Sequence, residues 1–286
     1  MTGKNFELEK VYPNTDKIEK LILQVDDLKK CLDSFRPFDK AQLENLEEAF
    51  DTEYTYDSNR IEGNTLTLQE THLVISKGMT IQGKPLKEHL EVINHKEALD
   101  FIKELVREET DFNESVLKQI HNLILRSIDR KNAGAYRNVQ VQIVGSKHTP
   151  PQPFLLQQLM EDYFKFYEEN KSSFHPVIFS AELHERLVTI HPFIDGNGRT
   201  SRLVMNLILM RNGFPIANIS GEKSERLEYY NALEKANIGE SKENFHRLVL
   251  KEVKKSLIRY LNNVSVSEDK TKGLYFFEKI DKFLDS

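Results

Sequence analysis

Apolar residues recur every three or four positions along most of this 286-residue chain, which is the spacing that one face of an α-helix presents to a core. Between residues 86 and 107, for example, Leu90, Ile93, Ala98 and Ile102 follow it. The same spacing predicts further helices over 39–56, 116–128, 154–168, 176–190, 199–211, 224–237 and 241–262. Because the apolar fraction of 39 % is enough for a core, we expect an all-α fold.

Local signals mark several helix ends. Thr67 and Glu70 have the spacing of a capping box at the start of a helix. Pro176 suits the first turn of another helix. Pro192 ends that helix, because the residue before a proline is pushed out of the α region. His191 is therefore expected where a helix gives way to a loop.

One segment, 134–153, departs from the helical pattern. Val139, Val141 and Ile143 alternate with glutamines, which is the period of a β-strand. A glycine and two prolines follow. The pattern predicts a small exposed β-hairpin, or flap, inside an otherwise helical bundle; an ordinary surface hairpin would have the same pattern.

The totals exclude some classes of protein. The formal net charge is −5, which gives no general reason to expect nucleic-acid binding. The chain has one cysteine, so no intrachain disulfide is possible. The first ten residues lack the apolar core of a signal peptide. No apolar run approaches the roughly 20 residues of a membrane span, so we expect a cytoplasmic protein without a membrane partner.

The segment from His191 to Arg202 carries the chemistry. It reads His-Pro-Phe-Ile-Asp-Gly-Asn-Gly-Arg-Thr-Ser-Arg. The residues Gly196, Asn197 and Gly198 let the backbone bend directly before a helix. Free N–H groups and the helix dipole make such a helix start an anion site.

Side chains around that loop extend the same chemistry. Arg199 and Arg202 are three positions apart, so they share a helix face and can fork onto phosphate oxygens. Asp195 is a hard oxygen ligand suited to Mg²⁺. His191 supplies a base. Together these groups predict attack on a nucleotide phosphate. The chain has no P-loop signature.

This segment resembles the Fic motif at every defined position, and the resemblance covers roughly residues 115–261. Gly134-Ala135-Tyr136-Arg137 resembles the start of the family's flap, and Tyr229-Tyr230 followed by Asn237 resembles its adenine pocket. Kinase-like relatives replace Gly198 with lysine, so the glycine here favours AMP transfer over phosphate transfer. The resemblance implies a Fic-type helical bundle that moves AMP from ATP to a Ser, Thr or Tyr hydroxyl of a target protein and releases pyrophosphate.

The resemblance also assigns roles to residues. It makes His191 the general base and Asp195 the Mg²⁺ ligand. It assigns nucleotide contacts to Asp195, Gly196, Asn197, Gly198, Arg199, Arg202, Tyr229, Tyr230, Asn237 and the flap residues Val144, Gly145, Ser146 and Lys147. The flap would also hold the target by main-chain pairing.

Ser58 to Asn64 reads Ser-Asn-Arg-Ile-Glu-Gly-Asn and resembles the inhibitory motif of this family. The resemblance marks Ser58, Glu62 and Asn64 as inhibitory residues. Glu62 would pair with Arg202, which the γ-phosphate otherwise needs. ATP would then bind with its α-phosphate turned away from the attacking hydroxyl.

Three regions are expected: an N-terminal helical region over 1–110 with an inhibitory helix at about 40–62, a Fic core over 111–262, and a linker with a short helix over 263–286. Automodification and a homo-oligomer are further expectations. Removal of AMP from a target, transfer of another phosphate-linked group, and a non-catalytic nucleotide-sensing regulator remain alternatives. The 25 or so residues after Leu261 are too few for the winged-helix domain of some relatives.

Overall fold

The computed structural model describes residues 7–38, 40–266 and 271–285, and over this part of the chain it is all-helical, as predicted. No β-strand occurs among the described residues. The elements are α1 (Leu8–Val11), α2 (Ile18–Asp33), α3 (Lys40–Ile61), α4 (Leu68–Lys77), α5 (Leu86–Arg107), α6 (Glu114–Leu125), η1 (Pro153–Leu155), α7 (Leu156–Asn170), α8 (Pro176–Ile190), α9 (Asn197–Arg211), α10 (Lys223–Asn237), α11 (Glu243–Val264) and α12 (Leu274–Leu284).

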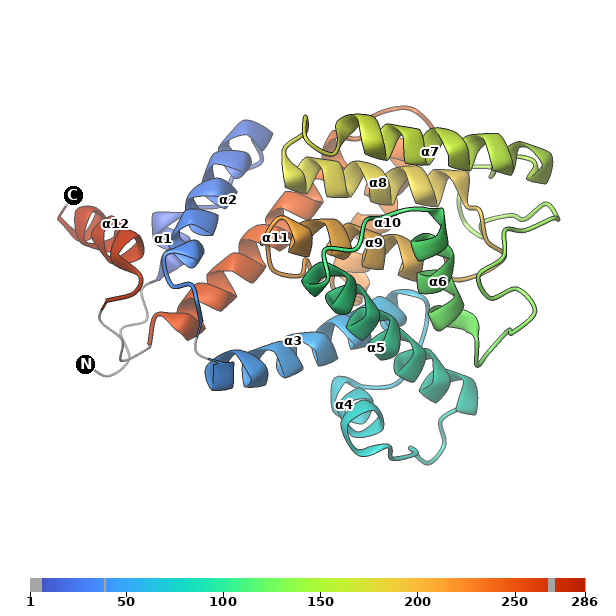
Figure 1. Cartoon of the computed structure of the whole chain (residues 1–286), viewed down its shortest axis with the longest axis horizontal. Helices are drawn as coiled ribbons and strands as arrows, with labels where there is room; N and C mark the ends of the chain where they lie inside the picture. The colour runs from blue at the N-terminus through green and yellow to red at the C-terminus, as the bar shows by residue number, and fades with distance from the viewer. Residues whose placement is uncertain (1–6, 39, 267–270, 286) are drawn as a thin grey trace.

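Helix α9 is the centre of the bundle. It packs against α8, α5, α6 and α3, and Figure 1 shows it enclosed by these helices. Most of its side chains are buried, including the polar residues Asn197, Arg199 and Arg202. Because α9 packs against four helices, the surrounding bundle holds the start of α9 in place.

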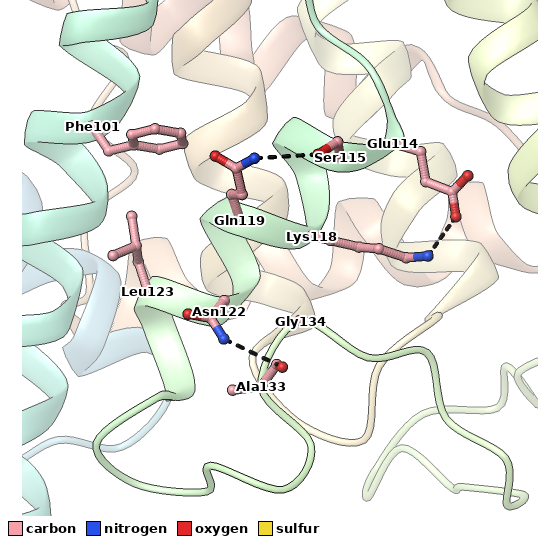
Figure 2. Close-up of a pocket in the computed structure, with 9 residues that line it drawn as sticks. All are labelled: Phe101, Glu114, Ser115, Lys118, Gln119, Asn122, Leu123, Ala133 and Gly134. Carbon is pink, nitrogen blue, oxygen red and sulfur yellow. Dashed lines mark hydrogen bonds and ion pairs between the residues drawn. The ribbon is translucent and has the colours of Figure 1, made fainter.

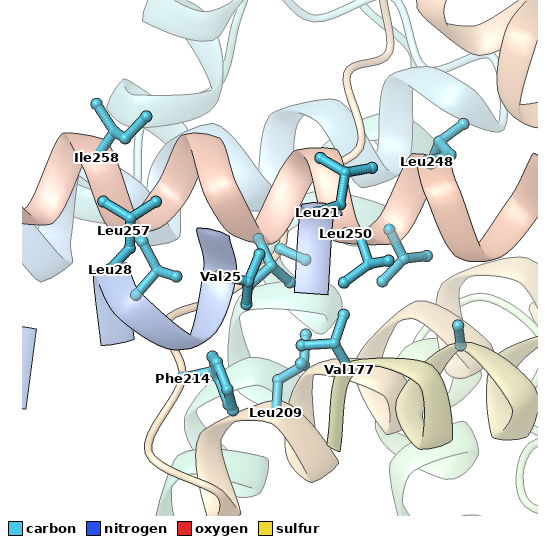
Figure 3. Close-up of a cluster of buried hydrophobic side chains, with 14 of the residues drawn as sticks. Leu21, Val25, Leu28, Val177, Leu209, Phe214, Leu248, Leu250, Leu257 and Ile258 are labelled. Atoms are coloured by element: carbon cyan, nitrogen blue, oxygen red, sulfur yellow. The ribbon is translucent and has the colours of Figure 1, made fainter. Parts of the chain in front are cut away.

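Two apolar clusters meet at α8 and α9. The first joins α2, α8, α9, α10 and α11. Figure 3 shows Leu28 of α2 beside Leu257 of α11, and Leu209 of α9 beside Val177 of α8. The second cluster joins α5, α6, α7, α8 and α9, with Leu183 and Leu207 among its buried residues. Because α8 and α9 belong to both clusters, the loop that connects them is fixed at both ends.

The predicted helix ends are confirmed. The Oγ1 of Thr67 accepts a hydrogen bond from the N–H of Glu70 (3.2 Å), and a Glu70 carboxylate oxygen accepts from the N–H of Thr67 (2.7 Å). Pro176 is the first residue of α8. Helix α3 spans Lys40–Ile61, so it extends beyond the periodic stretch at 39–56 and covers nearly the same residues as the helix expected at about 40–62. None of the described helices has both the length and the apolar character required to cross a bilayer.

The predicted β-hairpin over 134–153 is wrong: this segment is an irregular loop. Val139 is 49 % exposed, and Val141 and Ile143 are only half-buried, so none of the alternating apolar residues enters the core. The carbonyl groups of Val139 and Pro151 accept hydrogen bonds from the guanidinium of Arg137 (3.0 and 2.6 Å). The prolines of the returning limb have no N–H to donate to a ladder. Side-chain bonds to the backbone therefore replace the strand pairing.

Candidate functional site

His191 lies where α8 ends, in a left-handed backbone conformation (φ 50°). Its N–H donates to the carbonyl of Leu187 (2.9 Å) and so completes the last turn. Burial lowers the pKa of His191 to about 4, although the nearby backbone of Val188 acts in the opposite direction. The imidazole is therefore neutral near pH 7 and able to accept a proton.

The loop between α8 and α9 is closed by the side chain of Asn197. Its Nδ2 donates to the carbonyl of Phe193 (2.9 Å), and its Oδ1 accepts from the N–H of the same residue (3.0 Å). Gly196 adopts a left-handed conformation (φ 77°) that favours glycine. The amide of Asn197 is thus committed to shaping the loop, which leaves the backbone N–H groups at the start of α9 to meet an anion.

Arg202 is fully engaged with the end of α3. The side chain is 1 % exposed. Its Nη2 donates to Glu62 Oε1 (2.7 Å) and to the carbonyl of Ser58 (2.8 Å), and its Nε donates to Ser58 Oγ (3.0 Å). Its Nη1 donates to the hydroxyl of Tyr229 (3.3 Å). The ion pair that the sequence predicted between Glu62 and Arg202 is present.

Gly198 shows how closely Glu62 approaches the loop. A Cβ atom on this glycine would collide with Glu62 Oε1 and lie 3.2 Å from Arg202 Nη1. Glycine is therefore required here for Glu62 to reach Arg202, and any side chain at this position would displace the carboxylate.

Arg199 is equally buried but poorly satisfied. Its side chain is 3 % exposed, and the nearest carboxylate oxygens belong to Asp195 (3.5 Å) and Glu91 (3.8 Å). The Nε and Nη1 atoms have no hydrogen-bond partner within the described part of the chain. Buried donors of this kind normally find acceptors. An anion bound at the start of α9 would supply them.

Asn64 fixes the turn after α3. Its Nδ2 donates to the carbonyl of Glu88 (3.0 Å) and to a carboxylate oxygen of Glu91 (2.9 Å), and its Oδ1 accepts from the N–H of Leu66 (3.0 Å). Through Glu91, the turn that carries Glu62 is connected to Arg199.

The predicted adenine-pocket residues occupy two different environments. Tyr229 is buried, and its hydroxyl lies 3.0 Å from Nε2 of His184 as well as contacting Arg202. It supports the arginine from behind. Tyr230 is 43 % exposed and donates to the carbonyl of Ile61 (2.7 Å). The Oδ1 of Asn237 accepts a hydrogen bond from Thr189 near the end of α8 (2.8 Å).

The predicted flap residues lie at the tip of the loop and contact α10. Val144 and Gly145 are exposed. The Ser146 hydroxyl donates to the carboxylate of Glu234, and the N–H of Lys147 donates to the same carboxylate (2.6 Å). The loop tip is therefore fastened to the helix that carries Tyr230 and Asn237.

Sequence reasoning missed two buried residues beside the site. Arg137 is 3 % exposed, and its Nε donates to the carbonyl of His191 (2.8 Å). His121 contacts the carbonyl of Asp195 (2.9 Å), and burial lowers its pKa to about 4. The contacts join residues 54 and 74 positions apart. No local pattern indicates His121, and the segment that resembles the family's flap includes Arg137 without assigning it a role.

Asp195 is the one predicted metal ligand. Its side chain is 54 % exposed at the mouth of the loop, and one oxygen accepts from the N–H of Gly196 (2.6 Å). The described residues contain no group of three or more His, Cys, Asp or Glu side chains able to hold a metal. Mg²⁺ is commonly held by one or two carboxylates together with substrate phosphates, so this single carboxylate fits a metal that arrives with a nucleotide.

A separate open groove of about 660 Å³ lies along α6, between Phe101 of α5 and the turn at Gly134. Figure 2 shows its lining, in which Glu114 and Lys118 face each other; they form an ion pair of 2.7 Å. None of the predicted site residues lines it. Its charged groups neutralise each other, so it offers little to a charged ligand.

Comparisons with known proteins agree with the geometry. A family model described as Fic/DOC family matches residues 111–209. The chain is similar to Protein adenylyltransferase Fic from Drosophila grimshawi, with 35 % identity over 244 residues, or 85 % of this chain and 49 % of the relative. The Drosophila melanogaster protein is 34 % identical over 85 % of this chain and 48 % of its own length. The chain thus spans about half the length of these curated relatives.

Solved structures extend the comparison. A fragment of Fic-1 from C. elegans is 33 % identical with a TM-score of 0.76, covering 85 % of this chain and 72 % of that one. A Fic domain containing signaling protein from Bacteroides thetaiotaomicron is 28 % identical with a TM-score of 0.74, covering 83 % of this chain and 94 % of that one. The sequence motif, the bundle around α9 and these relatives agree: the chain belongs to the Fic/DOC family.

Proposed function

We propose that this protein transfers AMP from ATP to a Ser, Thr or Tyr hydroxyl of a target protein, with release of pyrophosphate. The observation that carries the proposal is the start of α9, where two buried guanidinium groups flank a glycine loop beside a neutral His191. Relatives over most of this chain are named protein adenylyltransferase, which supports the same reaction.

The phosphates would lie over the loop of Gly196, Asn197 and Gly198, in which the N–H of Gly196 donates to the carboxylate of Asp195 (2.6 Å). Arg199 has unused donors for phosphate oxygens. Asp195 would hold Mg²⁺, which supplies positive charge against the phosphates. These residues would stabilise the charge that develops on the leaving pyrophosphate.

In the chemical step, the target hydroxyl oxygen forms a bond to the α-phosphorus, and the bond from that phosphorus to the pyrophosphate oxygen breaks. His191 takes the hydroxyl proton. Its low pKa keeps the ring unprotonated and available. Arg137, which donates to the carbonyl of His191, would keep the imidazole directed at the reacting hydroxyl.

The adenosine would lie between α10 and the loop tip. Tyr230 and Asn237 lie on α10, and the tip residues Ser146 and Lys147 are fastened to that helix through Glu234. The exposed loop backbone around Val139 and Val144 would pair with an extended segment of the target. Pairing of this kind fits many sequences, so it is compatible with automodification.

Glu62 would act as a brake on the reaction. Arg202 is needed for the γ-phosphate, and Glu62 occupies it at 2.7 Å. Breaking a fully buried pair costs about 3–5 kcal/mol, and the 36 % exposure of Glu62 lowers this figure through solvent screening. At about 1.4 kcal/mol for each factor of ten, the upper limit of the effect is on the order of 10²–10³ in rate.

The test is automodification with labelled ATP. We expect strong labelling for Glu62→Gly, little for the wild type and none for Glu62→Gly combined with His191→Ala. Mass spectrometry should find the mass of AMP on a hydroxyl side chain. Equal labelling of wild type and Glu62→Gly would contradict the proposal that Glu62 inhibits the reaction. A different adduct would indicate transfer of another phosphate-linked group. If Glu62→Gly does not bind nucleotide, the proposed transferase activity is wrong.

A second candidate is removal of AMP from a modified target. The side chain of Glu62 is 36 % exposed, so a carboxylate oxygen is available to orient a water molecule. This reaction predicts that Glu62→Gly cannot release AMP from a modified substrate. Release at the wild-type rate by that variant would exclude a role for Glu62 in the reverse reaction.

A further inference from the structure

His121, on α6, has both ring nitrogens occupied. It is fully buried. The N–H of Gly134 donates to its Nδ1 (2.9 Å), and its Nε2 lies 2.9 Å from the carbonyl oxygen of Asp195. The imidazole also stacks on the ring of Phe193, with centroids 3.6 Å apart and planes 6° from parallel. The ring therefore contacts two backbone groups and one side chain around the site.

These partners determine the tautomer of His121. A backbone N–H only donates, so Nδ1 must be unprotonated to accept from Gly134. A carbonyl oxygen only accepts, so Nε2 must carry a proton and donate a hydrogen bond to the backbone carbonyl of Asp195. The ring is thus neutral and protonated on Nε2.

The position of the His121 ring also limits the size of the residue that can follow Asp195, which is Gly196. A Cβ atom on Gly196 would lie 3.4 Å from the His121 ring and 3.3 Å from the side chain of Ile124. The imidazole thus lies directly against the peptide that joins Asp195 to Gly196. Holding that peptide sets the direction of the Asp195 carboxylate and of the N–H groups that follow it.

We propose that His121 is a positioning residue for the reaction: its Nε2–H holds the carbonyl of Asp195 and so aims the phosphate-binding loop. The same ring accepts from Gly134, so it joins the root of the 134–153 loop to the phosphate-binding loop. The inference rests on the proposed function, because a positioning role for His121 requires that this loop binds the phosphates of a nucleotide. The tautomer itself requires no substrate.

Three substitutions separate the contacts of the ring. The side-chain amide of His121→Gln can donate to Asp195 from the position of Nε2. The amide oxygen of His121→Asn can accept from Gly134 near the position of Nδ1. His121→Phe keeps the stacking on Phe193 and loses both hydrogen bonds.

The chain also provides a matched control. His175, at the opposite end of α8, accepts from the N–H of Val177 at Nδ1 (3.3 Å) and contacts Asp26 through Nε2 (3.0 Å). It has the same kind of contacts away from the loop, so His175→Gln should leave the transfer rate unchanged.

The first measurement is ¹⁵N NMR of the imidazoles in the wild-type protein without nucleotide. We expect His121 to show a neutral ring protonated on Nε2. Amide hydrogen exchange should be faster at Gly196 in His121→Phe and His121→Asn, and close to wild type in His121→Gln. A ring protonated on Nδ1, or unchanged exchange at Gly196 in all variants, would overturn the proposal.

The second measurement is automodification in the Glu62→Gly background. A misplacement of about 1 Å can cost a factor of about 100 in rate, so we expect His121→Phe and His121→Asn to lose about 100-fold in kcat/KM for ATP. His121→Gln should recover to within about tenfold of the parent. Equal rates for the Gln and Asn variants would exclude positioning through Asp195. If Glu62→Gly itself is inactive, the proposed function fails, whereas the NMR and exchange results still decide the role of His121 in the loop.

Discussion

Arg199 and Arg202 lie one helical turn apart on α9, yet their surroundings differ. Arg202 donates four hydrogen bonds to Ser58, Glu62 and Tyr229. Arg199 has no hydrogen-bond partner for Nε or Nη1 in the described residues and has only long contacts to carboxylates. Both side chains are almost completely buried.

The difference shows how one phosphate-binding arginine can be occupied while the other stays available to an anion. The end of α3 satisfies one arginine completely with residues that are close in sequence, Ser58 and Glu62. It leaves the other arginine with donors to spare. Removal of Glu62 alone would still leave Arg202 held by Ser58 and Tyr229, so its guanidinium would be in place for a phosphate.

The largest expected effect is on stability. Arg202→Ala would leave the Glu62 carboxylate and the Ser58 and Tyr229 oxygens without their donor, so we expect a loss of about 3–5 kcal/mol in the free energy of unfolding. Arg199→Ala breaks no short hydrogen bond and should cost less than about half as much. Urea denaturation of both variants measures the difference. Equal losses would contradict the contrast between the two arginines.

Nucleotide binding gives the next effect. Hydrogen bonds to charged groups contribute about 1.5–3 kcal/mol, so Arg199→Ala should weaken ATP binding by about 10- to 100-fold in both wild type and Glu62→Gly. Arg202→Ala should weaken binding in Glu62→Gly and have little effect in the wild type, where Glu62 already occupies it. Isothermal titration calorimetry with Mg²⁺ present compares the four variants with their two parent proteins. A similar loss for Arg202→Ala in both backgrounds would show that Glu62 does not compete with the nucleotide.

Periodicity predicted the bundle and proline placement predicted the end of α8, because both depend on neighbours in sequence. The Glu62–Arg202 contact followed from the resemblance of two short segments to family motifs. The hairpin prediction failed because alternation of Val139, Val141 and Ile143 measures strand preference, whereas a ladder also needs a partner with free N–H groups. Pro150 and Pro151 cannot provide them.

The remaining site residues depend on contacts between distant segments. His121 and Arg137 are buried polar residues whose partners are backbone carbonyls of the loop before α9. A carbonyl is present at every position, so no residue type marks the partner. Tyr229 is predicted to contact the nucleotide, and its hydroxyl lies between Arg202 and His184, two partners that no local pattern indicates.

Acid should affect both arginine regions. Burial lowers the pKa of His121, near Arg199, to about 4, and burial also lowers the pKa of His184, near Arg202, well below its usual value. The folded state resists protonation that the unfolded chain accepts below about pH 6.5. Both histidines therefore contribute stability that is fully present above that pH and is lost as the pH falls; for His121 the loss is on the order of 1–2 kcal/mol at about pH 5.

Urea denaturation at about pH 7 and pH 5 measures this decrease. In His121→Gln the decrease should be smaller than in the wild type, because one buried imidazole is gone. The same substitution at the more exposed His72 is the control and should leave the decrease unchanged. A free energy of unfolding that does not change between the two pH values would contradict the assignment of neutral buried histidines.

The smallest expected effect tests the loose carboxylate beside Arg199. Glu91 accepts a hydrogen bond from Asn64 (2.9 Å) but is 3.8 Å from Arg199. Glu91→Gln keeps an oxygen for Asn64 and removes a negative charge near the anion site, so we expect ATP to bind about two- to fivefold more tightly, which is less than about 1 kcal/mol. Glu88→Gln is the matched control: this residue is on the same helix and bonds Thr65 (2.9 Å) instead of an arginine. Weaker binding by Glu91→Gln would mean that Glu91 holds Arg199 in place. Both arginines would then be held by a carboxylate, Arg202 by a short contact and Arg199 by a long one.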